Sequence, residues 1–251
     1  MGRIRPHFGE RRLQDVVVMS LCLGANLAVA LLCAAYLAAH SSVSGISWPW
    51  VLGFLFAGYL MADLVSGFVH WGIDTWFDWP KLGRVVAIAR EHHTHPHFIL
   101  GYGFLENAAL GCGPTAVAIG LAAAITAAFP ISLMSYGLMI VWFVTSSCLV
   151  FGTTVHNLSH QRSKSPIVRF AQKTRIIIRP EHHWVHHRGD QTVRYCVFSG
   201  WMNYVCDPLD MWRRLEWLIH KLTGAVPRQD DQAWQRHYRE TGVLAPPPAL
   251  D

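Results

Sequence analysis

Four long apolar segments occupy most of the first 152 residues. They span residues 16–39, 50–70, 108–129 and 131–152. A helix of about 20 residues crosses the hydrocarbon core of a bilayer, so each segment predicts a transmembrane helix. The third and fourth segments are separated only by Pro130. Because proline is excluded from a helix interior, these two are expected to form a tight helical hairpin.

The chain after residue 152 is mixed and basic, with one further helical pattern. Between residues 210 and 222, large apolar side chains recur at helical spacing opposite Arg213, Arg214 and Glu216. This pattern predicts an amphipathic helix that either lies on the membrane surface or packs beneath the histidine-rich site described below. From residue 227 the sequence becomes polar and then proline-rich. Residues 1–226 are therefore expected to form the membrane-embedded domain and residues 227–251 a polar tail.

The composition also indicates a membrane protein. Hydrophobic residues make up 52% of the chain and charged residues 15%, whereas about a quarter of the residues of soluble proteins are charged. The formal net charge of +5 comes from scattered Lys and Arg, which favours anionic lipid over nucleic acid as a partner. The six cysteines show no zinc-like pairing and are all expected to be reduced thiols.

The distribution of Lys and Arg predicts the orientation of the helices. Four precede the first apolar segment, three lie between the second and third, and fourteen follow the fourth. Under the positive-inside rule, both termini and the central connection lie in the cytoplasm. The membrane would be the inner membrane in a bacterium or the endoplasmic reticulum in a eukaryote. The predicted fold is an all-α integral membrane protein with four transmembrane helices and a cytoplasmic histidine-rich cap.

Fifteen histidines are present, and all but His40 fall on the predicted cytoplasmic side. Several have a histidine or an aspartate four positions away, which places both side chains on one face of a helix. The pairs are His70 with Asp74, His156 with His160, His182 with His186, and His183 with His187. Each pair can direct two ligands at one point. A run of solvated histidines is the alternative, and it does not account for four pairs on one side of the membrane.

This pattern favours a centre with two metal ions. A structural zinc site uses four ligands, commonly with thiolates, whereas this chain offers many imidazoles with no cysteine among them. Such ligation fits non-haem iron. The order E-H-H-W-V-H-H at residues 181–187 lacks the glutamate of the H-E-x-x-H zinc-protease motif. A metal transporter would place ligands near the bilayer midplane, and a haem-linked or quinone-linked carrier would place them within the spans.

Asp63 is a carboxylate within the second apolar segment, where a charge at the bilayer centre costs at least about 2.5 kcal/mol. It precedes His70 by two helical turns, so Asp63, His70 and Asp74 lie along one stripe of the helix. We expect Asp63 to face the bundle interior. There it would either accept a hydrogen bond from a metal-binding imidazole or join two helices by a hydrogen bond.

Four strings resemble the plasmanylethanolamine desaturase family, which is related to a plant palmitate desaturase of phosphatidylglycerol. They are D-L-V-S-G-F-V-H-W-G-I-D-T-W (63–76), A-R-E-H-H (89–93), H-N-L-S-H (156–160) and E-H-H-W-V-H-H (181–187), followed by S-G-W-M-N-Y. The resemblance runs in order from residue 63 to residue 224. It implies a lipid desaturase that converts the O-alkyl chain of an ether phospholipid, plasmanylethanolamine, to the vinyl ether of a plasmalogen.

The resemblance also implies cofactors, partners and site residues. The family is understood to use two iron ions, O₂ and electrons from a small donor such as cytochrome b5 or a ferredoxin. Matching positions give the implied iron ligands as His70, His92, His93, His156, His160, His182, His183, His186 and His187, with Asp74 beside them. Asp74 and His187 are expected to be indispensable for catalysis. His95 and His97 depart from the family pattern and are expected to lie outside the ligand set.

Other lipid substrates fit the same residues. Ligands at the cytoplasmic ends of helices lie near the headgroup level, where the first carbons of an ether-linked chain would lie. An acyl-lipid desaturase or a hydroxylase with the same metal centre is an alternative that the sequence does not separate from the ether-lipid reaction.

Overall fold

Helices are the regular elements of the part of the chain that the structure describes. The computed structural model describes residues 13–42, 45–77, 89, 92–93, 95–188 and 191–228. The elements are α1 (Leu13–His40), α2 (Trp48–Trp76), the 3₁₀ helix η1 (Phe98–Gly101), α5 (Phe104–Ala128), α6 (Leu133–Ser159), α7 (Pro166–Lys173), α8 (Pro180–Arg188), α9 (Asn203–Cys206) and α10 (Met211–Thr223). The all-α prediction is confirmed for these residues, whereas most of the predicted polar tail lies outside them.

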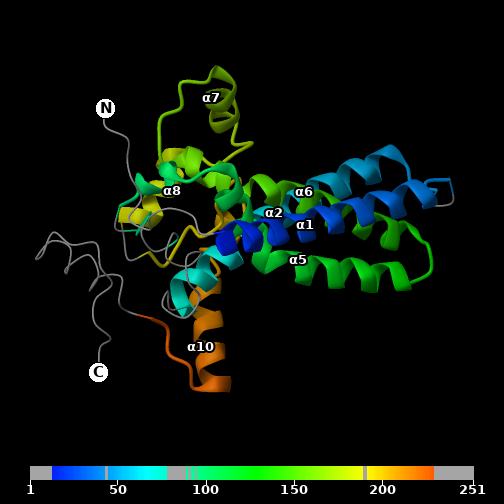
Figure 1. Cartoon of the computed structure of the whole chain (residues 1–251). Coiled ribbons are helices and arrows are strands. Elements are labelled where there is room, and N and C mark those ends of the chain that lie inside the picture. The colour runs from blue at the N-terminus through cyan, green and yellow to red at the C-terminus, as the bar shows by residue number, and fades with distance from the viewer. Residues whose placement is uncertain are drawn as a thin grey trace, which may run out of the picture.

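Four long helices form an elongated bundle with short helices at one end. Helices α1, α2, α5 and α6 run side by side, and α7, α8 and α10 gather at the same end of them (Figure 1). Helix α10 runs across the direction of the bundle rather than along it. Helix α6 packs against α1, α2 and α5, whereas α2 and α5 touch each other only sparsely. The bundle therefore has its tightest packing around α6.

Three of the long helices are long and apolar enough to cross a membrane. They are α1 from Val16 onward, α2 and α6. Helix α5 is bent by 49° between Phe104–Gly113 and Thr115–Ala128, and it makes a fourth span if its two halves are taken together. The bend falls at Pro114, which has no backbone N–H to donate to the preceding turn. Three of the four predicted spans are thus supported directly, and the fourth is a bent helix.

Two of these helices continue beyond the ends predicted from the apolar pattern. Helix α2 runs on from residue 70 to Trp76, and α6 runs on from residue 152 to Ser159. The added turns carry polar side chains, among them Asp74 and His156, that are nevertheless buried. Packing of these turns against other elements stabilises the helix beyond the end of the apolar segment.

Small and polar residues allow the helices to approach closely. A Cβ placed on Gly58 of α2 would lie 2.8 Å from a side-chain carbon of α6, and one on Gly111 of α5 would lie 2.8 Å from the Leu149 carbonyl oxygen. Both glycines therefore permit backbone contact with α6. Between α1 and α6, the Asn26 side-chain amide donates to the Ser146 carbonyl oxygen at 2.8 Å, and the Ser146 hydroxyl donates back to the Asn26 carbonyl oxygen at 3.0 Å.

The connection between α5 and α6 is the predicted hairpin. Only four residues separate Ala128 from Leu133, and Pro130 is one of them. The Ser135 backbone N–H donates to the Ser132 hydroxyl at 3.1 Å, and the Ser132 backbone N–H donates to the Ser135 hydroxyl at 2.9 Å. This reciprocal cap fixes the first turn of α6, the helix that carries two histidines at its other end.

Candidate metal centre

The end of the bundle next to α8 brings together nine donor side chains. His70 and Asp74 lie in the last turns of α2, and His156 and His160 lie at the end of α6. The donors form two groups, and within each group the ligand atoms all lie within 4.8 Å of one another. The five-imidazole group is His92, His156, His160, His183 and His187. The Asp74 group is His70, Asp74, His93 and His186.

In the five-imidazole group, the Nε2 atoms of four rings converge. The His183 Nε2 lies 2.8 Å from that of His156, 2.9 Å from that of His160 and 2.9 Å from that of His187. The His156 and His160 Nε2 atoms are 3.2 Å apart. Since metal–imidazole bonds are about 2.1 Å long, donors at right angles lie about 3 Å apart and opposite donors about 4 Å apart. These separations suit donors arranged around one ion.

In the Asp74 group, three imidazoles surround a carboxylate oxygen. The Asp74 Oδ2 lies 3.2 Å from the His70 Nε2, 3.3 Å from the His93 Nε2 and 3.5 Å from the His186 Nε2. All four side chains are buried. A carboxylate with several imidazoles is a donor set that suits a divalent transition metal such as iron.

The two groups lie against each other. The ring centroids of His92 and His93 are 4.6 Å apart, and those of His70 and His156 are 5.3 Å apart. Nine donors exceed what one ion can bind, and their division into adjacent groups of five and four fits two neighbouring ions.

Helix α8 supplies both groups because consecutive helical residues point about 100° apart. His186 therefore reaches the Asp74 group, while His187 and His183 reach the five-imidazole group. The structure brings together three of the four predicted pairs: His70 with Asp74, His156 with His160, and His183 with His187. His182 and His186 do not share a group.

Two backbone carbonyls orient rings of the Asp74 group. The His70 Nδ1 donates to the Tyr195 carbonyl oxygen at 3.1 Å, and the His186 Nδ1 donates to the Val193 carbonyl oxygen at 2.7 Å. A carbonyl only accepts, so the proton of each neutral ring is on Nδ1, and the Nε2 lone pair faces Asp74. Residue type and spacing did not point to Val193 or Tyr195, because a backbone carbonyl has no signature in residue type.

The buried imidazoles are in the form that binds metal. Loss of solvation, reinforced by neighbouring histidines, holds the pKa values of His92, His160, His183 and His187 below the ordinary histidine value. The rings are therefore neutral and have a lone pair to donate. Among the described residues, both ring nitrogens of His92 and the His70 Nε2 are buried without a hydrogen-bond partner. Orphaned polar atoms of this kind are costly, and a cation would satisfy them, so the residues fit a metal centre.

The remaining candidate donors lie outside both groups. All six cysteines are free thiols, as predicted, and none belongs to either group. His95 and His97, which the sequence placed outside the ligand set, also belong to neither group. The donor chemistry is therefore imidazole and carboxylate without thiolate.

His182 has a different environment from the other histidines of α8. Its Nε2 accepts a hydrogen bond from the Asn203 side-chain amide at 2.9 Å and lies 3.4 Å from the Arg194 Nη1. Burial, followed by the charge of Arg194, lowers its pKa. The predicted ligand His182 therefore connects α8 to α9 and to the segment before it, instead of facing the two groups.

Asp63 anchors a loop. Its carboxylate is fully buried. Its Oδ1 accepts from the backbone N–H groups of residues 198–200 at 2.7–3.1 Å, and its Oδ2 accepts from that of Met202 at 2.9 Å. These bonds replace the hydration that the charge has lost. Its partners are backbone amides rather than an imidazole, so Asp63 affects the site through the loop that follows Tyr195, whose carbonyl orients His70.

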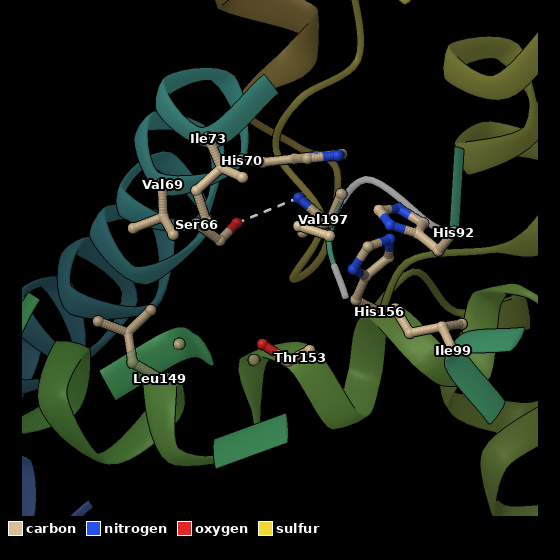
Figure 2. Close-up of a pocket in the computed structure, with 13 residues that line it drawn as sticks. Ser66, Val69, His70, Ile73, His92, Ile99, Leu149, Thr153, His156 and Val197 are labelled. Atoms are coloured by element: carbon tan, nitrogen blue, oxygen red, sulfur yellow. Dashed lines mark hydrogen bonds between the residues drawn. The ribbon is translucent and has the colours of Figure 1, made fainter. Parts of the chain in front are cut away.

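An apolar cavity of about 60 Å³ adjoins both groups. Its wall includes His70 from the Asp74 group and both His92 and His156 from the five-imidazole group. Val69 and Leu149 lie across the cavity from the His92 ring (Figure 2). An apolar pocket that ends on two groups able to hold a metal ion can hold a short apolar segment next to them.

Long apolar helices with a buried imidazole and carboxylate site at one end define a class of membrane proteins that can hold two metal ions. Residues 59–230 match the lipid desaturase domain family. The chain is 35% identical over 195 residues to plasmanylethanolamine desaturase 1 of Mus musculus, covering 74% of this chain and 71% of the mouse protein. It is also 35% identical over 192 residues to plasmanylethanolamine desaturase of Myxococcus xanthus, covering 72% of this chain and 64% of that protein.

A plant relative is more distant. Fatty acid desaturase 4, chloroplastic, of Arabidopsis thaliana is 30% identical over 180 residues, covering 69% of this chain and 53% of the plant protein. No solved structure matches the chain. The chain belongs to the lipid desaturase family, and it is therefore an oxidoreductase, as the histidine strings predicted.

Proposed function

We propose that this chain removes two hydrogens from the O-alkyl chain of plasmanylethanolamine, an ether phospholipid, and so forms the vinyl ether of a plasmalogen at a di-iron centre. The observation that carries the proposal is the apolar cavity that ends on two adjacent imidazole-rich groups. The choice of lipid is supported by 35% identity to plasmanylethanolamine desaturases from a mammal and a bacterium.

The five-imidazole group would hold one iron and the Asp74 group the other. When bound, the two irons would supply the activation of O₂ that desaturation requires. The Tyr195 and Val193 carbonyls keep the Nε2 lone pairs of His70 and His186 aimed inward. The Asp74 carboxylate would offset part of the positive charge of its ion, which neutral imidazoles cannot do.

The reaction balances with O₂, two external electrons and two protons. Two C–H bonds of adjacent carbons are broken and one C=C bond is formed, so the lipid loses two hydrogens with their electrons. O₂ takes up these two hydrogens with their electrons, and with two more electrons from a donor and two protons from water it leaves as two molecules of water. The apolar wall around Val69 and Leu149 would keep bulk water away while this happens.

A surface hollow of about 530 Å³ offers a place for the electron donor. It includes His160 of the five-imidazole group together with Arg162, Trp184 and Arg188. The Trp184 ring centroid lies 5.8 Å from that of His187, so the hollow reaches close to two ligands. We propose that a small redox protein such as cytochrome b5 or a ferredoxin docks here, where the two arginines favour an acidic surface.

The proposed orientation places both termini and the metal centre in the cytoplasm. It is supported by Lys and Arg, which are absent from the connections between the first and second and between the third and fourth apolar segments. A C-terminal fluorescent-protein fusion should fluoresce, and a C-terminal alkaline phosphatase fusion should be inactive. An active phosphatase fusion would reverse the orientation.

Lipid profiling tests the substrate. The chain would be expressed in a host that contains ether lipids but makes no vinyl ethers, with a His187→Ala variant as control. We expect acid-labile vinyl ethers only with the intact chain. If the intact, iron-loaded protein gives no vinyl ether, the plasmalogen assignment is wrong.

Metal analysis of the purified protein tests the centre. We expect about two irons per chain from two ligand groups. One zinc per chain, or no iron, would contradict the di-iron proposal independently of the lipid result.

An acyl-lipid desaturase is the second candidate, and the name of the Arabidopsis relative favours it. The same lipid extracts separate the candidates. A new double bond in an acyl chain, or a hydroxylated chain, with no change in the ether lipids would support this alternative.

A further inference from the structure

The cavity beside the metal-binding groups is too small to hold a whole lipid chain. Its volume is about 60 Å³, whereas pockets for complete small-molecule ligands occupy roughly 300–1,000 Å³. If the chain acts on a lipid, as proposed above, the cavity has room for only the reacting carbons. The rest of the hydrocarbon chain must lie elsewhere on the molecule.

A larger groove of about 490 Å³ lies on the outside of the bundle between α2 and α5. Its walls are formed mainly by apolar side chains, with Trp142 of α6 also lining it. Phe68 and Phe77 line the groove and are 41% and 46% exposed, so it opens at the protein surface. The sparse contact between α2 and α5 leaves space for it.

The groove and the cavity share a wall. Val69 and Ile73 of α2 line both of them. These residues are four positions apart and therefore lie on one face of the helix. They pack with Ala89, which also lines the cavity. Because these two side chains lie between the groove and the cavity, we refer to the pair as the gate.

The position and direction of the groove fit a hydrocarbon chain of the bilayer. Along α2 the groove extends from Phe77, at the end that carries the histidines, to Val65, which is a distance of about 18 Å. It therefore follows the helix axis, as lipid chains follow the membrane normal. At the Phe77 end of the groove, the Arg228 guanidinium donates to the Phe77 carbonyl oxygen. This contact places a positive charge where a phospholipid headgroup would lie.

We propose that the groove between α2 and α5 is the lateral binding site for a hydrocarbon chain of the phospholipid substrate, and that Val69 and Ile73 gate its passage to the metal centre. This inference rests on the proposed lipid desaturation. The hydrocarbon chain enters from the bilayer rather than from water. The gate separates the part of it that lies in the groove from the reacting carbons in the cavity.

Neighbouring residues on α5 give a matched test. Ala118 lines the groove, whereas Val117 is 79% exposed and does not. We expect Ala118→Phe to fill the groove and lower product formation by about tenfold or more, because a displaced substrate reacts poorly. Val117→Phe adds the same ring on the surface and should keep wild-type product formation. Equal product from both variants would overturn the proposal.

A second pair of variants, both on α2, tests the other wall of the groove, because Gly72 lines it and Gly53 does not. A Cβ on Gly72 would meet only the Phe77 ring, at 3.9 Å, and a Cβ on Gly53 would meet nothing within 4 Å. Gly72→Leu should lower product formation while Gly53→Leu should not. Gly72 is near His70 and Asp74, so the iron content of each variant is measured too. A Gly72→Leu protein with normal iron and normal product would count against the groove.

A photoreactive probe separates this proposal from the proposed function. The probe is a phospholipid with a diazirine in its hydrocarbon chain, used with the purified full-length protein in lipid nanodiscs. We expect labelled peptides from α2 and α5 around Gly72 and Ala118, and at least about tenfold less labelling in Ala118→Phe. Labelling of the groove in a protein that makes no vinyl ether would refute only the proposed reaction. An active protein labelled elsewhere, or one whose groove is covered by a second copy of the chain, would refute the groove.

Discussion

Two histidines of α8, His187 and His182, differ in what their Nε2 atoms contact, and this difference predicts different effects of replacing them. The His187 Nε2 lies 2.9 Å from that of His183 in the five-imidazole group, whereas the His182 Nε2 accepts from Asn203. We expect His187→Ala to lose iron and to lower activity by at least about 100-fold. His182→Ala should keep its iron, because its ring is directed away from both groups. Elemental analysis of the two variants checks this, and equal iron loss would return His182 to the ligand set.

Asp63 gives a second prediction at this scale. Asp63→Ala leaves the backbone N–H groups of residues 198–200 and of Met202 without their acceptor, so we expect the free energy of unfolding to fall by more than about 3 kcal/mol. Asp63→Asn keeps one acceptor oxygen and should lose less. Thermal unfolding in detergent, measured beside iron content, tests the order. Iron loss in Asp63→Asn with unchanged stability would instead indicate that Asp63 acts directly at the metal.

Residue types and spacing pointed to most of the side chains that the fold gathers into the two groups, but not to how those side chains divide between the groups. The i,i+4 rule correctly joined His70 with Asp74, but it also joined His182 with His186. The rule describes one helix, whereas the partner of each ring depends on which segment lies opposite. For His182 that segment contains Asn203, and for His186 it contains the Val193 carbonyl. These contacts join residues that only the folded loop brings together.

Among the helices, α10 supports the candidate metal centre from behind. Trp212 is 2% exposed and packs with Tyr195, whose carbonyl accepts from His70. Trp217 of the same helix is 62% exposed. The helix predicted between residues 210 and 222 therefore packs beneath the site through one face, and the other face is left uncovered.

Two tryptophan variants of α10 test this arrangement. We expect Trp212→Ala to destabilise the protein by about 3–5 kcal/mol, because it creates a cavity behind Tyr195. Trp217→Ala should change stability by no more than about 0.5 kcal/mol. Thermal unfolding and iron content would be measured together. If the two variants lost similar stability, α10 would not be the support of the site.

The length of the apolar segments located the long helices but not their ends. The predicted apolar segments coincide with α1, α2, α5 and α6, because burial in hydrocarbon requires about 20 apolar residues. The final turns of α2 and α6 are polar, and they remain helical because they pack within the site. The bend of α5 also interrupts a continuous apolar run, and hydropathy does not register a missing backbone hydrogen bond at Pro114.

At the scale of the whole molecule, the same end of the bundle combines apolar and polar burial. The cavity brings hydrocarbon-like walls to the rings of His70, His92 and His156. Most of the donors around it are more than nine-tenths buried, so the fold concentrates polar atoms where solvent does not reach them. This arrangement links the stability of the bundle to metal binding.

Removal and return of iron should therefore change the stability of the entire chain. An ion present at about 100 times its dissociation constant stabilises the folded state by about 2.7 kcal/mol. We expect chelation to lower the melting temperature in detergent and Fe²⁺ under anaerobic conditions to restore it. His183→Ala weakens only the five-imidazole group and His186→Ala only the Asp74 group. Each variant should therefore show part of the rise in melting temperature that Fe²⁺ gives the wild-type protein. His182→Ala should show the full rise in melting temperature. Melting temperatures that do not respond to Fe²⁺ would show that the two groups are held by the fold alone.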